Sequence, residues 1–167
     1  LVSDEMPSRA LTILSELQAT LPPWSAPLCA KLLVDLRGDL SGAASCLADG
    51  LSKMAATERA PWLGEAASLS LRIGSVEVAL QVLRWCDELS KSGPLTELLS
   101  GLFHLAEWDD LINPELGAQF DELLMRLGER AKAEESMHAY AMTRARRLLS
   151  QRMADEAHRW ALVALEA

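Results

Sequence analysis

The chain has 167 residues, half of them apolar, and a formal net charge of −8 at pH 7. This length suits one domain with a sizeable core, and the apolar content excludes a disordered chain. The acidic balance repels phosphate backbones, which argues against nucleic acid as a partner, and the short apolar runs exclude a membrane-spanning protein.

The apolar residues are mainly Leu and Ala, which favour helices, whereas the β-branched and aromatic residues typical of strands are scarce. Prolines and glycines divide the sequence into helical lengths, because glycine ends helices and proline begins or interrupts them. We expect irregular extra length around Asn113–Ala131. The predicted helices are, in chain order, Arg9–Ala19, Pro27–Arg37, Leu40–Met54, Pro61–Ile73, Val76–Lys91, Leu95–Ala106, Trp108–Ile112, Glu115–Leu127, Lys132–Ser150 and Arg152–Glu166.

The segments between these helices repeat along the chain. When Gly38 is laid on Gly74, an offset of 36 residues, Ala43 also falls on Ala79. A glycine before the second helix ends the first and permits a sharp turn, and a small residue within the second helix lets the two approach closely. The residues predicted to pack between the helices of each repeat are Ala10, Ala43, Ala79, Leu111 and Ala157.

This pattern resembles the tetratricopeptide repeat (TPR) family, whose signature between paired helices reads roughly Gly-Asp-aromatic-acidic-Glu-Ala. Gly38-Asp39 matches its start, Glu107-Trp108-Asp109-Asp110 its centre and Asp155-Glu156-Ala157 its end. The resemblance implies an all-α fold, a right-handed array of antiparallel helix pairs (a TPR-like α-α superhelix). Other paired-helix solenoids are the competing fold. We expect residues 1–167 to form a single TPR-like repeat domain, an excerpt of a longer chain, because Arg9–Ala19 has no preceding partner helix.

The resemblance also implies a concave groove lined by the first helix of each pair. Members of the family that grip a peptide C-terminus place Lys, Asn and Arg in this groove, and here only Arg146 qualifies. The remaining positions are apolar with small polar gaps, which suits an apolar helix or extended segment, although burial under a neighbouring element is an alternative. The groove positions carried over are Leu28, Leu32, Asp35, Ser68, Leu71, Thr96, Ser100, Phe103, Met142, Arg146 and Leu149.

Nothing in the sequence predicts catalysis or a cofactor. His104, His138 and His158 lie in different helices and form no pair at metal-ligand spacing. There is no glycine-rich phosphate loop and no Ser or Cys in a nucleophile elbow. We therefore expect neither an enzyme nor a metal or cofactor site.

Three cysteines, Cys29, Cys46 and Cys86, form no CxxC pair, and each lies in an apolar helical stretch. There a free cysteine behaves as a small hydrophobic residue, and a reducing, cytoplasmic location is expected. The basic cluster Arg144, Arg146, Arg147 and Arg152 is interpreted mainly as a solvated helix face, with contact to an anion or an acidic partner as the alternative.

The expected function is a scaffold or adaptor that binds a polypeptide segment in its apolar groove, with a chaperone-like role as a sharper version. A protein or peptide partner is expected, no membrane partner is expected, and a homo-oligomer is left open. The alternative is a ligand- or partner-sensing segment of a larger, transcriptional regulator. A closed apolar pocket would favour the regulator, and an open groove would favour the scaffold.

Overall fold

A computed structural model describes residues 9, 12–13, 22–108 and 113–167. Every regular element within these ranges is a helix, which confirms the prediction of an all-helical chain for the described residues. Ala10, Leu111 and most of the predicted helices Arg9–Ala19 and Trp108–Ile112 lie outside them. The elements are the 3-10 helix η1 (Pro23–Ser25), α2 (Ala26–Leu32), the π-helix η2 (Leu33–Arg37), α3 (Leu40–Ser52), α4 (Ala56–Arg59), the 3-10 helix η3 (Ala60–Trp62), α5 (Leu63–Ile73), α6 (Val76–Leu89), α7 (Leu95–Leu105), α8 (Pro114–Ala133), α9 (Met137–Ser150) and α10 (Ala154–Glu166).

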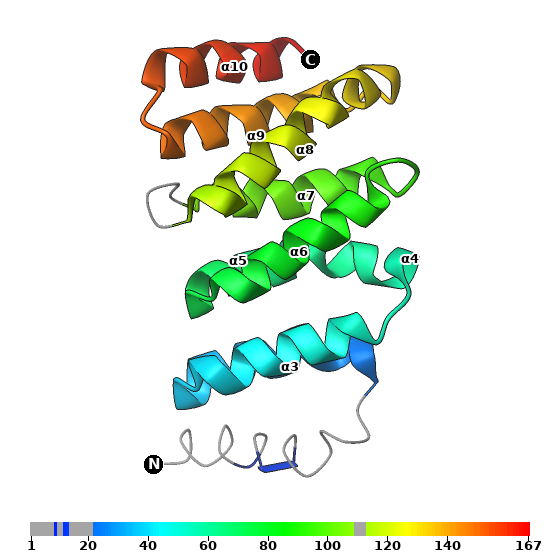
Figure 1. Ribbon diagram of the computed structural model, residues 1–167, viewed down its shortest axis with the longest axis vertical. Helices are drawn as coiled ribbons and strands as arrows, with labels where there is room; N and C mark the ends of the chain where they lie inside the picture. The colour runs from blue at the N-terminus through cyan, green and yellow to red at the C-terminus, as the bar shows by residue number, and fades with distance from the viewer. Residues whose placement is uncertain (1–8, 10–11, 14–21, 109–112) are drawn as a thin grey trace.

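Helices that are consecutive in the sequence pack against one another in pairs. Helix α2, continued by η2, packs on α3, α5 packs on α6, and α9 packs on α10. Along one side α2, α5, α7 and α9 are in contact in succession, and on the other side α3 contacts α6, which contacts α8. The helices therefore stack from one end of the molecule to the other, with the C-terminal α10 at the end of the stack (Figure 1).

Glycines end two of the first helices. Gly38 follows η2 with φ 62°, and Gly74 follows α5 with φ 70°. This left-handed conformation is tolerated by glycine, which has no Cβ, and it turns the chain sharply into the next helix. Asp39 then caps α3, where its Oδ1 accepts a hydrogen bond from the Gly42 N–H at 2.8 Å, and Ser75 caps α6 in the same way.

The boundary between α8 and α9 differs from the prediction. The segment expected to be irregular, Asn113–Ala131, is mostly one regular helix, α8, which starts at Pro114 and runs on to Ala133. The predicted helix Lys132–Ser150 was wrong at its start, since the chain turns at Glu134–Ser136. Glu135 adopts φ 53° at this turn. A non-glycine residue rarely takes this conformation. Because no glycine or proline stands at this turn, the sequence did not predict it.

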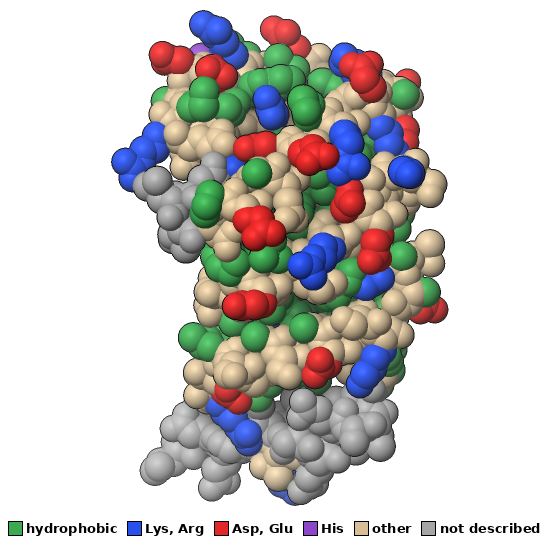
Figure 2. All heavy atoms as spheres, in the orientation of Figure 1, with side chains coloured by type: hydrophobic (Ala, Val, Ile, Leu, Met, Phe, Trp, Pro, Cys, Tyr) green, Lys and Arg blue, Asp and Glu red, His purple; other side chains and the backbone are tan. Residues whose placement is uncertain are grey.

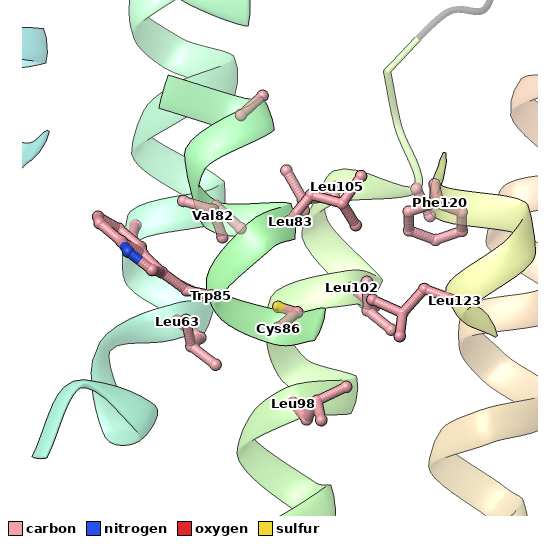
Figure 3. Packing of buried hydrophobic residues seen from close by; sticks show 14 of the residues in the cluster. Leu63, Val82, Leu83, Trp85, Cys86, Leu98, Leu102, Leu105, Phe120 and Leu123 are labelled. Carbon is pink, nitrogen blue, oxygen red and sulfur yellow. The ribbon is translucent and has the colours of Figure 1, made fainter. Parts of the chain in front are cut away.

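Helix α6 lies at the centre of the core. Its buried side chains Val82, Leu83 and Cys86 pack among residues of α5, α7 and α8 (Figure 3). The neighbours in the figure are Leu63 of α5, Leu98, Leu102 and Leu105 of α7, and Phe120 and Leu123 of α8. This cluster extends from Ala30 to Tyr140, so one continuous core links successive helix pairs.

Candidate functional site

An apolar hollow lies between α7, α9 and α10. Its volume is about 610 Å³, it opens to solvent, and carbon atoms make up most of its lining surface. Four of the predicted groove residues, Phe103, Met142, Arg146 and Leu149, line it. The remaining lining residues are Glu107, Ala145, Ser150 and Ala161. We call this site the C-terminal hollow.

The spacing of residues on α9 explains how they meet at this site. Met142, Arg146 and Leu149 follow one another at four and three residues, which places them on one face of the helix. Met142 is 39% exposed and Leu149 is 60% exposed, whereas Ala145 beneath them is buried. Large apolar side chains that remain in water beside a hollow are typical of binding surfaces.

Arg146 lies at the edge of the hollow and is held from two sides. Its guanidinium forms an ion pair with Glu107 and lies 4.1 Å from the centre of the Phe103 ring. Burial lowers the pKa of Arg146, and burial and the nearby Arg146 charge both lower the pKa of His104. Stacking on an aromatic ring positions a cation where an incoming polar group can reach it.

The other predicted groove residues lie further along the first helices. Asp35 forms an ion pair with Arg72, which joins η2 to α5. Leu71 is half-buried and packs against the core, while Leu28 is 56% exposed. The remaining groove residues are Leu32 and Ser68, which are half-buried, and Thr96 and Ser100, which are exposed. Only the last four members of the predicted set line the C-terminal hollow, so a continuous groove stays a prediction.

The residues predicted to pack between helices are buried wherever they are described. Ala43 and Ala79 are 0% exposed and Ala157 is 2% exposed. Ala10 and Leu111 lie outside the described residues. Burial is compatible with the predicted repeat positions, although it does not distinguish this register from another paired-helix array.

The interpretation of the arginine cluster as a solvated helix face is wrong for Arg147. Its side chain is only 2% exposed and donates to Asp121 from Nε at 2.9 Å and from Nη2 at 3.2 Å. It also donates to the Trp108 carbonyl oxygen at 3.2 Å. Arg147 thus links α9 to α8 and to Trp108, which follows α7. Its positive charge is paired with the Asp121 carboxylate.

Four residues of the C-terminal hollow were not among the predicted groove residues: Glu107, Ala145, Ser150 and Ala161. Ala161 comes from α10, a second helix, whereas the resemblance places groove residues on first helices only. Glu107 was assigned to the repeat signature and not to the groove. The i, i+4, i+7 arrangement of Ala157, Ala161 and Ala164 was the available signal, since a row of small residues lets two helices lie close together.

The described residues contain no group of three or more His, Cys, Asp or Glu residues that could hold a metal ion. Within the same part of the chain, no helix has the length and apolar character needed to cross a membrane. A hollow of about 580 Å³ between α3 and α6 is lined by apolar side chains together with serines and carboxylates, so its lining is more polar than that of the C-terminal hollow.

Comparisons with protein-family models, with curated proteins and with solved structures found no match for this chain.

Proposed function

We propose that this protein is a binding scaffold of the TPR-like kind, which holds an apolar polypeptide segment in the C-terminal hollow. The observation that supports this most strongly is the open apolar surface formed by Phe103, Met142 and Leu149. A partner segment with aliphatic or aromatic side chains at helical or alternating spacing can cover these residues and remove them from water.

The charged residues at the edge of the hollow determine the orientation of the bound segment. Arg146 and Glu107 neutralise each other in the free protein, so the hollow has no net charge that requires a charged partner. A polar or charged group that flanks the apolar segment can exchange with either member of the pair. Affinity then comes from the apolar contacts, and the ion pair selects the orientation of the segment.

The alternative, a sensor segment that binds a small ligand, is supported less well. A volume of about 610 Å³ is large enough for a small molecule. Such ligands are normally enclosed over most of their surface, whereas this hollow opens broadly to solvent. The shape therefore favours an extended or helical partner that projects beyond the hollow.

Selection from a random peptide library displayed on phage tests the proposal without a known partner. The wild-type protein should enrich peptides with two or more large apolar residues, and the variant Met142→Ser/Leu149→Ser should not. Both side chains are exposed, so the free energy of unfolding of the double variant should lie within about 1 kcal/mol of the wild-type value. Met125→Ser on α8 removes an apolar side chain that is 69% exposed and lies outside the hollow, and it serves as the matched control. Equal enrichment by the wild type and the double variant would contradict the proposal that the C-terminal hollow is the binding site.

A further inference from the structure

Helices α2 and α3 approach each other unusually closely. A Cβ atom added to Gly50 of α3 would lie 2.2 Å from the Cβ of Ala26 of α2, so only the missing side chain allows this contact. The two helices run in opposite directions, because the turn at 38–39 reverses the chain. One turn further into the pair, Cys29 of α2 and Cys46 of α3 therefore face each other.

The two thiols share one cavity. Cys29 and Cys46 both line a hollow of about 270 Å³ that opens to solvent between α2 and α3. Cys29 is buried and Cys46 is partly exposed, and both are free thiols in the structure. The two thiols interact directly, and the Cys46 Sγ also lies 3.9 Å from the Ala26 carbonyl oxygen.

This arrangement favours an interhelix disulfide. A disulfide needs Cα atoms about 4.4–6.8 Å apart with side chains directed toward each other. The contact between Gly50 and Ala26 brings the two helix backbones close together, and one turn away Cys29 and Cys46 both line the common cavity.

We propose that Cys29 and Cys46 are a modification site at which a peroxide-class oxidant forms a reversible disulfide between α2 and α3. One thiolate attacks hydrogen peroxide, the O–O bond breaks, and a sulfenic acid and one water result. The second thiolate attacks the sulfenic sulfur, the S–S bond forms, the S–O bond breaks and hydroxide leaves as a second water. Two thiols and one peroxide thus give one disulfide and two waters, and an external thiol such as dithiothreitol restores the pair.

The surroundings of the pair determine how fast it reacts. Burial, followed by the neighbouring Cys29 thiol and the Asp49 carboxylate, raises the pKa of Cys46 to about 11. Asp49 and Lys53 are the charged groups that line the same cavity. Because Cys46 must lose its proton at one of the two steps, oxidation is slow at neutral pH and accelerates as the pH rises.

Cys86 provides an internal control. It lies in the core of α6 and is 0% exposed, and burial raises its pKa to about 12. No peroxide molecule reaches this thiol in the folded protein. Oxidation of the native protein should therefore consume two of the three thiols and leave Cys86 reduced.

Peptide mapping of the whole reduced protein, treated with hydrogen peroxide at pH 8.5, tests the proposal. Trypsin places each cysteine in its own peptide, residues 10–31, 38–53 and 85–91. After alkylation of the remaining thiols, a non-reducing digest should show 10–31 linked to 38–53, with 85–91 alkylated. The linked species should disappear with dithiothreitol, and its rate of formation should rise at least tenfold between pH 7 and pH 9.

Cysteine variants separate this result from nonspecific oxidation. Cys29→Ser and Cys46→Ser should each abolish the linked peptide, and Cys86→Ser should leave it unchanged. Links that include Cys86, disulfides between two molecules, or sulfinic and sulfonic acids at unlinked Cys29 and Cys46 would overturn the proposal. Three thiols that remain free under conditions that oxidise the urea-unfolded protein would overturn it as well.

Discussion

Substitution of Gly50 by Ala measures how closely α2 and α3 approach. The new methyl group would lie 2.2 Å from the Ala26 Cβ and 3.4 Å from the Pro23 carbonyl oxygen. Carbon atoms in contact normally lie about 3.5–4.0 Å apart, so the helices must separate by more than about 1 Å. The Ala26 methyl group is attached to the backbone and cannot rotate away, so the whole helix has to move.

Two opposing contributions determine the magnitude. Alanine is favoured over glycine within a helix by about 0.5–1 kcal/mol, which stabilises the variant. Overpacking of a close contact costs about 1–3 kcal/mol, and this contact is much shorter than an ordinary one. We expect Gly50→Ala to lower the free energy of unfolding by about 1–2 kcal/mol and the melting temperature by about 2–8 °C.

Urea denaturation followed by far-ultraviolet circular dichroism supplies the measurement, and two further variants make it specific. Ala26→Gly removes the opposing methyl group, so Gly50→Ala/Ala26→Gly should recover most of the loss caused by Gly50→Ala. Gly64→Ala is the matched control, because the one short contact of its new Cβ would be with the Ser100 Oγ at 2.4 Å, and this exposed hydroxyl can rotate away. If Gly50→Ala stabilised the protein as much as Gly64→Ala does, α2 and α3 would not be in the close contact described.

Three other substitutions test the packing and the electrostatics. Ala79→Leu should lower the free energy of unfolding by about 1–3 kcal/mol, because it overpacks a position that is 0% exposed. Ala118→Leu on the exposed face of α8 should change stability little. Equal losses for the two variants in urea denaturation would refute the assigned packing. Arg147→Ala should lower the free energy of unfolding by about 2–4 kcal/mol, because it removes the ion pair between the buried Arg147 and Asp121. The control Arg159→Ala, at an exposed position, should leave stability unchanged. An unchanged stability of Arg147→Ala would contradict the link between α8 and α9. The pKa of His104 is lowered in the folded protein, so the unfolded chain binds a proton at a higher pH than the folded protein does. The contribution of neutral His104 to stability is therefore complete above about pH 6.5 and is lost as the pH falls below that value. His104→Asn should weaken this fall in denaturation midpoints between pH 7 and pH 5, and identical pH profiles would contradict the assignment.

The sequence predicted the helices well where local chemistry marks their ends. Gly38 and Gly74 end η2 and α5 in the left-handed conformation, and Pro114 starts α8. The turns at Glu135 and Arg152 have the same positive φ without glycine, so composition gives no signal for them. In both turns the backbone N–H of the third residue beyond the helix donates a hydrogen bond to a carbonyl within its last turn, as from Met153 to Leu148 at 2.9 Å.

The candidate site was only partly predictable. The resemblance to TPR proteins placed Phe103, Met142 and Arg146 on first helices, and these three residues meet at the C-terminal hollow. The participation of Ala161 and the burial of Arg147 depend on how α10 and α8 pack against α9. Such tertiary contacts leave no periodic signal in a single sequence, and an arginine in a basic helix is usually solvated.

The outer surface adds a second apolar feature near the same end of the molecule. Leu162, Val163 and Leu165 of α10 are 46%, 38% and 81% exposed. On the face shown in Figure 2, hydrophobic side chains gather over the end of the stack formed by α10. Exposed apolar residues thus lie on both α9 and α10, the two helices that contribute to the proposed binding surface.

Methionine methyl resonances provide the most direct test of binding at the C-terminal hollow. In protein labelled with ¹³C at the methionine methyl groups, a peptide enriched by the library selection should shift the Met142 signal. The signal of Met125, which is exposed on α8 outside the hollow, should stay in place. A shift that saturates at Met142 with Met125 unchanged is the result that this account predicts. Binding of the same peptide that shifts Met125 and leaves Met142 unchanged would contradict it.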